Sequence, residues 1–428
     1  MRLITLNLFF LVSLLAGCTG QFDVARSSSS PCEDASVSAE CILELAQSEL
    51  DKIEDDYLWA ASAIELVVAY DENKNSSEAW QVIQQVLAKT RLLDADKSRE
   101  TLYGELLSAL ESMQKSNNYF QVKDQLGVAI ANVKDEIKRL DLMGKLLVFQ
   151  AAQGQYAEAL AQAIAMPETT DAQKGYKART LKDVSMQIAK QGDFEVAVSA
   201  ARNVDMSMPY YRAVALADIA RLAIASGDSE LAMAILQEAE SLGRAEENGY
   251  FRAGALRDVA CGYVLIGERN SAVGLINDAR SAARVANSPN ERARSMSRIA
   301  TKLADCGLND YASEIISEAI ALAETIEDAS AIKNYSYYEI AGSAAFSAQY
   351  DVAEDIVNKL PSTAFGNATS LLAASQRDLA WGVARGGNVA QALEIAKGIG
   401  SPREKIHALS RLVRIVNNPN MDALPRYL

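Results

Sequence analysis

The sequence contains one histidine, His407, among its 428 residues. Histidine is the commonest metal ligand and the side chain that titrates near neutral pH, so this scarcity excludes most zinc sites and most histidine-based catalysis. His407 also has no cysteine or carboxylate at ligand spacing, and no serine triad can be assembled around a second histidine. The P-loop, dinucleotide and HExxH motifs are absent. The sequence therefore predicts no catalytic residue, no metal site and no cofactor.

Aromatic residues make up only 7% of the chain, and proline occurs 8 times. No sustained period-two alternation occurs, so we expect essentially no sheet. Lys and Arg total 42 against 56 Asp and Glu, which gives a formal net charge of −14. Nucleic-acid binding depends on cations that neutralise phosphates, so this balance argues against a nucleic-acid partner.

The first residues have the pattern of a secretory signal. A short basic start precedes a mostly apolar run, residues 3–15, which is too short for a comfortable membrane span of about 20 residues. The run ends in Leu15-Ala16-Gly17-Cys18, which resembles the bacterial lipobox. The alternative is an ordinary signal peptide with a chance cysteine.

The lipobox resemblance implies a bacterial outer-membrane lipoprotein. Residues 1–17 would be the signal peptide, and Cys18 would become the mature N-terminus carrying diacylglycerol and an amide-linked acyl chain such as palmitate. Thr19 stands where an inner-membrane retention signal usually has Asp, which favours an outer-membrane anchor with the body in the periplasm. Residues 18–34 include the run Ser27–Ser30 and are expected to form a flexible tether.

Four further cysteines follow the predicted lipidation residue. Cys32 and Cys41 are close in sequence, and in an oxidising compartment they would form a local disulfide; two unpaired thiols are the alternative. Cys261 and Cys306 fall at unlike positions inside predicted helices, so we interpret them as small core residues.

The body of the chain repeats itself at about 40 residues, from roughly residue 55 to residue 400. Successive anchor positions lie 35 to 41 residues apart. They are Lys74, Gln114, Gly154, Gly192, Gly227, Gly267, Gly307, Ala348 and Gly387.

Two columns relative to the anchors predict a helix–turn–helix unit. Eight residues before every anchor stands an apolar residue, part of the i, i+3, i+4, i+7 stripe of an amphipathic helix. The anchor Gly ends that helix because it adopts the left-handed conformation cheaply. Five residues after eight of the nine anchors stands Ala, small enough for the two helices to approach closely. Pro167, Pro209, Pro289, Pro361 and Pro402 fall between units, where no helix is interrupted.

This pattern resembles the tetratricopeptide repeat (TPR), although the unit is about 40 residues long where a TPR has about 34. Ala239, Ala279 and Ala319 match the second-helix alanine of that motif. The resemblance implies an all-α fold, a right-handed α-solenoid of about nine helix–turn–helix repeats. We expect the solenoid to span residues 35–428 with a capping helix at each end, the last one, at about residues 402–416, having no partner helix.

Two charged columns also recur once per unit. We interpret them as a ladder of ion pairs between neighbouring first helices, because a catalytic dyad would occur once. Fifteen residues before the anchors stand Arg99, Arg139, Lys177, Arg212, Arg252, Arg292 and Lys333. Nine residues before them stand Glu65, Glu105, Asp183, Asp218, Asp258, Glu339 and Asp378.

The TPR resemblance places other first-helix residues on the concave face. They imply a basic, aromatic-rich groove for an acidic peptide, a partner's C-terminal tail or an anionic glycan; solvated or locally paired side chains are the alternative. The predicted groove residues are Arg179, Lys182, Arg221, Arg257, Arg294, Tyr335, Tyr338, Arg377, Trp381 and Arg385.

These observations together predict a non-enzymatic, membrane-anchored scaffold or adaptor that binds an extended peptide or protein partner in the cell envelope. One alternative is a cell-wall-associated enzyme or enzyme regulator. A second alternative is a surface lipoprotein that binds glycans or nutrients, which would need clustered exposed aromatic residues.

Overall fold

The computed structural model describes Cys32 and residues 37–113, 117–327, 331–362, 364–365 and 369–418. This part of the chain forms 20 helices and one pair of two-residue strands. The elements are α1 Ala39–Leu50, α2 Asp56–Glu72, α3 Ser76–Leu92, α4 Asp96–Ser112, α5 Asn117–Ala131, α6 Glu136–Ala152, α7 Tyr156–Ile164, α8 Asp171–Lys190, α9 Phe194–Arg202, α10 Pro209–Ala225, α11 Ser229–Ala245, α12 Gly249–Leu265, α13 Arg269–Arg284, α14 Pro289–Asp305, α15 Asn309–Glu324, α16 Ala331–Phe346, α17 Tyr350–Val357, β1 Ala364–Phe365, β2 Thr369–Ser370, α18 Leu371–Arg385, α19 Val389–Gly398 and α20 Pro402–Asn417.

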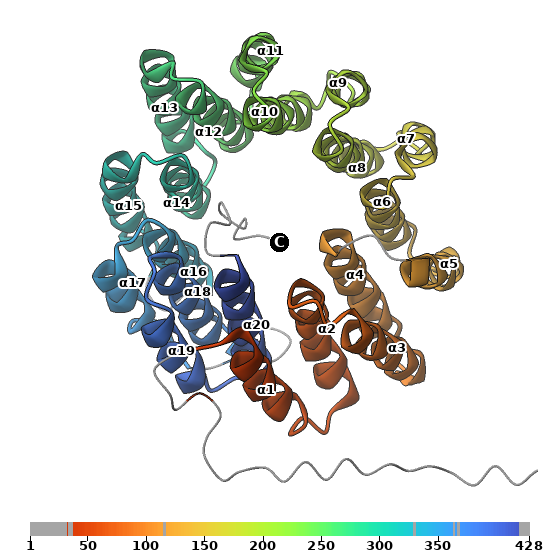
Figure 1. Ribbon diagram of the computed structural model, residues 1–428. Helices are drawn as coiled ribbons and strands as arrows, with labels where there is room; N and C mark the ends of the chain where they lie inside the picture. Colours follow the sequence, from red (N-terminus) through yellow and green to blue (C-terminus); the bar gives the residue numbers. More distant parts are fainter. Residues whose placement is uncertain are drawn as a thin grey trace, which may run out of the picture.

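The helices form two concentric layers (Figure 1). The even-numbered helices, called the inner helices below, surround the centre, and the odd-numbered outer helices pack behind them. Nine consecutive hairpins, from α2–α3 to α18–α19, follow one another along the chain. The predicted all-α solenoid of TPR-like hairpins is thus confirmed. The strands β1 and β2 form a small antiparallel pair in the connection between α17 and α18.

Eight of the nine hairpins turn at their predicted anchors, and the ninth anchor, Gln114, lies outside the described residues. The six anchor glycines have φ between 80° and 93°, the left-handed region that glycine adopts without a Cβ penalty. Lys74 and Ala348 hold the same conformation at φ 63° and 59°, so the turn is kept even where the sequence has no glycine. After the anchor, a backbone N–H donates back into the helix, as from Asp228 to the Ala223 carbonyl at 2.9 Å. This bond satisfies a carbonyl that the ending helix would leave open.

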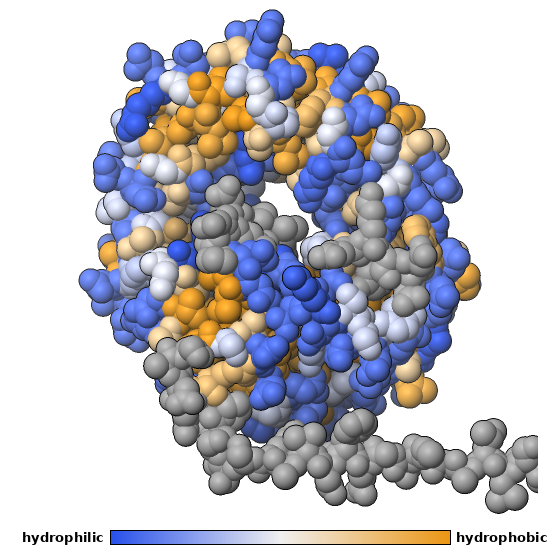
Figure 2. All heavy atoms as spheres, in the orientation of Figure 1, coloured by the Kyte–Doolittle hydropathy of each residue, from blue (hydrophilic) through white to orange (hydrophobic). Residues whose placement is uncertain are grey.

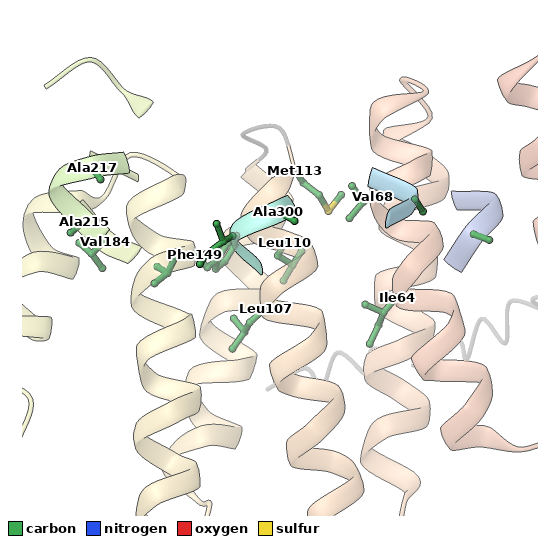
Figure 3. Close-up of a cluster of buried hydrophobic side chains, with 14 of the residues drawn as sticks. Ile64, Val68, Leu107, Leu110, Met113, Phe149, Val184, Ala215, Ala217 and Ala300 are labelled. Atoms are coloured by element: carbon green, nitrogen blue, oxygen red, sulfur yellow. The ribbon is translucent and has the colours of Figure 1, made fainter. Parts of the chain in front are cut away.

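The space between the layers is filled by small and aliphatic side chains. The alanines five residues after the described anchors are fully buried, as Ala232 and Ala272 illustrate. Figure 3 shows Ile64, Leu107 and Phe149 of three successive inner helices buried along the row. Close-packed interiors tolerate little change in volume, so the alanines set how closely the two layers approach.

The basic column fifteen residues before the anchors does not form the expected inter-helix ladder. Four of its arginines, Arg99, Arg139, Arg212 and Arg292, instead donate to backbone carbonyls at the end of the preceding outer helix. Arg139 Nη1 donates to the Val133 carbonyl at 2.9 Å, and Arg292 Nε to the Ala286 carbonyl at 2.9 Å. A cation at a helix C-terminus satisfies open carbonyls and complements the helix dipole. The prediction for this column was therefore wrong, and its role is to cap.

The two ends of the chain meet and close the solenoid into a ring (Figure 1). α20 packs against α18 on one side and against α1 and α2 on the other. Arg414 Nε donates to Glu72 at 2.7 Å, and Arg403 forms an ion pair with Glu105 at 2.9 Å, across 298 residues of sequence. We call this contact between α20, α1 and α2 the seam.

The seam corrects the prediction that the final helix has no partner. α20 occupies an inner position and α1 an outer one, so the two chain ends together form the equivalent of a tenth hairpin. Ile42 and Leu50 of α1 and Leu409 and Leu412 of α20 are fully buried there. Burying one such side chain is worth about 1.5–3 kcal/mol, which makes the apolar contact the main stabilising contribution at the seam.

Several predictions fall on other parts of the chain. The signal peptide (1–17), the lipidation residue Cys18 and all of the tether except Cys32 lie outside the described residues. None of the helices in the described ranges combines the length and apolar character needed to cross a bilayer.

Replacing an anchor glycine with alanine tests the turn. We expect Gly227→Ala to lower the free energy of unfolding by about 1 kcal/mol, because the left-handed conformation disfavours a Cβ. The added Cβ would meet no atom within 4 Å, so the cost is that of the backbone. Chemical denaturation monitored by circular dichroism measures the change.

Gly274→Ala is the matched control. Gly274 lies within α13, and a Cβ there also meets nothing within 4 Å. Alanine in a helix interior should stabilise the protein by about 0.5–1 kcal/mol. Equal effects of the two substitutions would contradict the assignment of the anchor as a left-handed turn.

Candidate functional site on the inner wall

The candidate site is the inner wall, by which we mean the exposed and half-buried side chains of the inner helices. The space-filling view shows an opening inside the ring that is bordered largely by hydrophilic side chains (Figure 2). The acidic column nine residues before the anchors lies on these helices. Five of its members pair with cations of the same or a neighbouring inner helix, and these cations include several of the predicted groove residues. The five are Asp183, Asp218, Asp258, Glu339 and Asp378.

The first cluster of charges lies on α6, α8 and α10. Arg179 forms an ion pair with Asp141 of α6 at 3.5 Å and lies over the Tyr176 ring at 4.8 Å. Its side chain is 46% exposed, which is the largest exposed fraction among the predicted basic groove residues. Lys182 pairs with Asp183 beside it. Burial lowers the pKa of Lys182, but Asp183 and Asp218 more than offset this and raise it above its usual range.

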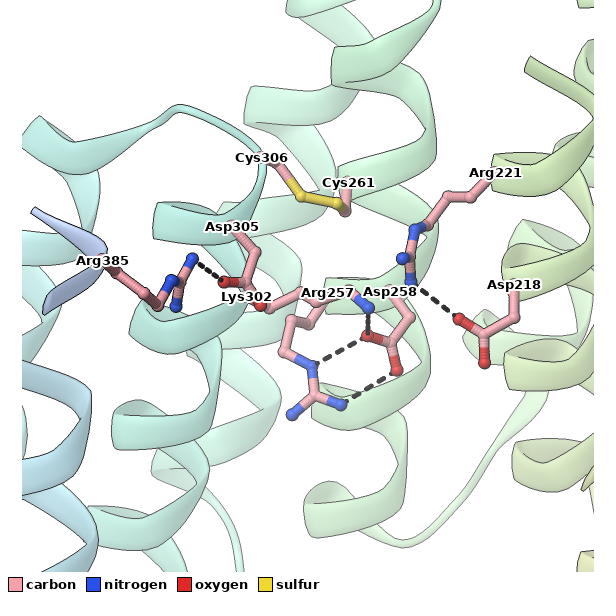
Figure 4. The surroundings of a disulfide bond; sticks show 9 residues. All are labelled: Asp218, Arg221, Arg257, Asp258, Cys261, Lys302, Asp305, Cys306 and Arg385. Atoms are coloured by element: carbon pink, nitrogen blue, oxygen red, sulfur yellow. Dashed lines mark hydrogen bonds and ion pairs between the residues drawn. A yellow bond between two sulfur atoms is a disulfide. The ribbon is translucent and has the colours of Figure 1, made fainter. Parts of the chain in front are cut away.

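A second cluster runs from α10 to α18 (Figure 4). Asp258 of α12 accepts from Arg257 at 2.9 Å and from Lys302 of α14 at 3.3 Å, so one carboxylate joins two inner helices. Burial raises the pKa of Asp258, but the two cations more than offset this and hold it well below its usual range. Arg221 pairs with Asp218 at 2.9 Å and remains 38% exposed.

A third cluster joins α12, α14 and α16. Glu339 is buried and accepts from Arg298 at 3.3 Å, with Arg294 at 3.6 Å. The Arg294 guanidinium also lies 4.8 Å from the centre of the Tyr335 ring, and Arg298 donates to the Tyr250 hydroxyl at 2.6 Å. Cation–π contact and ion pairing together hold both guanidinium groups in place.

Three of the last predicted groove residues, Tyr338, Arg377 and Trp381, lie in the contact between α20 and the helices α16 and α18 rather than in an open groove. Arg377 is buried and pairs with Glu404 of α20 at 2.6 Å. It also donates to the Tyr338 hydroxyl at 3.3 Å. Trp381 is only 2% exposed and lies beneath Arg411 of α20, 3.7 Å from its guanidinium carbon. These side chains hold α20 against α16 and α18, so the prediction that they line a groove was wrong.

Arg385 joins two inner helices that are not adjacent, α18 and α14. Its guanidinium reaches past α16 to Asp305 of α14 at 3.3 Å (Figure 4). It also lies 4.9 Å from the centre of the Phe346 ring. Arg385 therefore has an acidic partner within the ring, as do Arg257, Arg294 and Arg377. The predicted basic groove is in fact a wall of compensated charge pairs.

His407 and Glu65 face each other across the seam at 3.2 Å. Burial raises the pKa of Glu65 to about 7, although Arg403 and Arg411 partly offset it. Burial, followed by the surrounding arginines, lowers the pKa of His407 well below its usual value. Below about pH 7 the carboxyl group is therefore protonated and the imidazole is neutral, so the carboxyl can donate to the imidazole nitrogen that carries no hydrogen.

Both pairs of cysteines among the described residues form disulfides. Cys32 and Cys41 are bridged with Cα atoms 5.6 Å apart. Cys261 of α12 is bridged to Cys306, the C-cap residue that follows α14, with Cα atoms 5.7 Å apart (Figure 4). The interpretation of Cys261 and Cys306 as separate core residues was therefore wrong. The two cysteines occupy different positions within their repeats, and the disulfide joins one repeat to the next.

Sequence reasoning missed Lys302, Arg298 and the seam residues of α20. Lys302 and Arg298 lie five and nine residues before an anchor, outside the positions assigned to the groove. A search for bases within reach of the acidic column would have found both. Within the described residues no group of three or more His, Cys, Asp or Glu side chains could hold a metal ion. The wall offers hydrogen-bonding and charged groups for recognition.

A scan against protein families found no match, and no curated protein matched the sequence. Several solved structures are similar in part. The nearly identical TPR-like repeats of a protein described as a kinesin light chain of Podosopora anserina share 17% identity, with a TM-score of 0.29, over 43% of this chain and 92% of that one.

Two further structures match more of the chain. Aspartyl phosphate phosphatase F from Bacillus subtilis shares 13% identity with a TM-score of 0.30, over 82% of this chain and 95% of its own. A circular tandem repeat protein with a novel repeat topology shares 15% identity with a TM-score of 0.23, over 89% and 96%. Scores this low give no basis for transferring function or ring geometry.

Removing the inter-unit disulfide tests its contribution. We expect Cys261→Ser/Cys306→Ser to lower the free energy of unfolding by about 4 kcal/mol, because the bond closes a loop with a sequence separation of 45. Thermal or urea unfolding of the oxidised proteins measures the loss.

Cys32→Ser/Cys41→Ser provides the comparison. That bond spans only 9 residues, so the same reasoning predicts a loss of about 2.6 kcal/mol. Equal losses in the two double variants, or no effect of reducing agent on wild type, would contradict the account.

Glu65→Gln tests the protonation of the seam. Glu65 has a folded-state pKa above its unfolded value, so its contribution to stability is fully present at low pH and lost as pH rises through about 7. The free energy of unfolding of wild type, relative to Glu65→Gln, should therefore fall as pH rises from about 5 to about 7. A difference that is flat, or that rises, across this range would show that Glu65 is charged in the folded ring.

Proposed function

We propose that this protein is a lipid-anchored scaffold of the bacterial cell envelope whose ring binds an extended segment of a partner protein along its inner wall. The observation that carries the proposal is the closed ring itself. Its inner helices surround one opening (Figures 1 and 2) and carry charged and tyrosine side chains from α6 to α16. Solenoids bind extended ligands along such surfaces.

The chemistry of the wall supports a polypeptide ligand. Arg179 and Arg221 keep 46% and 38% of their side-chain exposure, and each lies beside a carboxylate. Guanidinium and carboxylate groups in alternation can bind side chains of both signs as well as backbone amides. Most of the predicted basic groove residues pair with a carboxylate of the ring, and this disfavours a purely anionic ligand such as an acidic glycan.

The cysteines support the proposed location. Disulfides persist in oxidising compartments such as the bacterial periplasm, and the described part of the chain has two. The fifth cysteine of the sequence, Cys18, follows the apolar N-terminal run at the lipobox position. Lipidation there would anchor the ring to a membrane through several acyl chains.

Partner capture tests the inner wall. We expect wild-type protein to retain one or more envelope proteins from detergent-solubilised membranes, and Arg179→Glu/Arg221→Glu to lose at least ten-fold of that capture, because both side chains are exposed there. Quantitative mass spectrometry of the captured proteins gives the comparison. The two substitutions leave the more deeply buried ion pairs of Asp258 and Glu339 intact.

Arg269→Glu/Lys52→Glu is the matched control, because it reverses the same number of charges at exposed positions outside the inner helices. It should capture the same proteins as wild type. Loss in both variants would mean that net charge, rather than the wall, controls binding. Unchanged capture by Arg179→Glu/Arg221→Glu would contradict the proposed site.

Cys18→Ser tests the anchor. In bacterial cells we expect the wild-type chain to sediment with membranes and to incorporate labelled palmitate, and the variant to do neither, because the thiol is the proposed attachment point. If the Cys18→Ser chain still incorporated labelled palmitate, Cys18 would be ruled out as the lipidation site.

A further inference from the structure

The two edges of the ring differ in a way that the inner wall does not explain. At one edge the inner helices end, and eight of them end in a described anchor turn; we call this edge the turn rim. At the other edge each outer helix ends and the next inner helix begins; we call this edge the loop rim. Because all inner helices run in the same direction, every connection of one kind lies on the same edge.

Exposed large hydrophobic side chains concentrate on the loop rim. Nine such side chains occur in the described part of the chain, and eight of them lie on this edge. Only Leu265, the last residue of α12, lies on the turn rim. The eight are Leu92, Val128, Ile137, Ile164, Met206, Phe251, Val285 and Ile332.

Their positions place them at the ends of helices rather than in a groove. Leu92 and Ile164 are the last residues of α3 and α7 and are 76% and 41% exposed. Val285 is the C-cap residue that follows α13, and Ile332 is the second residue of α16; they are 64% and 56% exposed. Singly exposed apolar residues are normal, but a distribution this one-sided marks a contact surface.

The cations of the outer helices accompany these side chains. Arg202, Arg244 and Arg284 lie in the last turns of α9, α11 and α13. Each pairs with a carboxylate of the next outer helix, Glu238, Asp278 and Glu318 respectively, and the three side chains are still 54%, 48% and 51% exposed. Each is therefore close in sequence to an exposed hydrophobic residue of the loop rim. The first turns of α9 and α11, at the turn rim, carry the acidic residues Glu195 and Glu230. Acidic residues such as Asp171 and Glu291 also begin inner helices at the loop rim, so that edge carries charges of both signs.

We propose that the loop rim is a membrane-contacting surface that rests on an anionic phospholipid bilayer. The proposal rests on the lipid anchoring proposed above, which would hold the ring beside a bilayer. The hydrophobic side chains are spread around an arc from α3 to α16 and are separated by charged residues, so they suit an extended flat surface. Aliphatic groups enter the headgroup boundary while neighbouring arginines bind lipid phosphates.

Lipid quenching measures which edge meets the membrane. Full-length lipid-modified protein is reconstituted in vesicles of phosphatidylethanolamine and phosphatidylglycerol with brominated acyl chains. A tryptophan is introduced by Phe251→Trp at the loop rim or by Leu265→Trp at the turn rim, both within α12. Wild type gives the background from its three native tryptophans.

We expect the Phe251→Trp emission, after subtraction of that background, to fall at least two-fold in brominated relative to unbrominated vesicles, and the Leu265→Trp emission to stay unchanged. Equal quenching of both, quenching of Leu265→Trp alone, or quenching of neither would overturn the proposed orientation.

A second measurement separates rim from anchor. The Cys18→Ser chain, which lacks the attachment residue, is sedimented with the same vesicles without bromine. We expect measurable binding that falls at least five-fold in a chain that also carries Ile164→Ser/Met206→Ser/Val285→Ser. No binding of Cys18→Ser itself would overturn the rim proposal while leaving the anchor intact. A third outcome would also overturn the proposal: the chain forms a dimer that the serine substitutions dissociate, and it binds no lipid. The rim would then be an interface with a second copy of the chain.

The two measurements distinguish failure of the proposed lipid anchor from failure of the proposed loop-rim contact. If the mature chain carries no lipid at Cys18 by mass spectrometry, the proposed function loses its membrane attachment, and sedimentation of the unlipidated chain still decides whether the rim binds phospholipid.

Discussion

The packing of α20 between α18 and the pair α1–α2 determines the shape of the molecule. In an open solenoid the terminal units expose apolar faces and need polar capping helices. Here each end of the chain covers the other, since Ile42 and Leu409 from opposite ends of the sequence are both fully buried. Closure turns a concave groove into a continuous wall around one opening. It also separates the two kinds of connection onto two edges.

The charges of the wall follow from the same geometry. Once inner helices lie side by side, a carboxylate on one helix comes within reach of a cation on the next, as Asp258 does with Lys302 and Glu404 with Arg377. A charge left unpaired in such a partly desolvated position is costly, so compensation is expected wherever burial is substantial. What remains for a ligand is the exposed part, chiefly Arg179, Arg221 and the half-buried tyrosines.

The sequence was sufficient to predict each hairpin, because the information is local. Periodicity located the helices, and spacing identified Lys74 and Ala348 as turn positions although neither is glycine. Closure could not be predicted this way, since ring curvature depends on small packing differences summed over all units. One feature of the sequence did point to closure: a single unpaired helix precedes the nine hairpins and another follows them, and the two together can form one more hairpin. The groove prediction failed at Arg377 and Trp381 because it assumed an open concave face.

The most direct test of the closed ring joins its two ends covalently. Across the seam, Asn417 Nδ2 donates to Asn73 Oδ1 at 3.2 Å, and the two residues are separated by 344 residues of sequence. In an Asn73→Cys/Asn417→Cys chain the closed ring predicts an intramolecular disulfide between these two residues, identified by mass spectrometry of peptides from the monomer. If both engineered thiols stayed free in the folded monomer under oxidising conditions, the chain ends would not meet and the ring would be an open solenoid.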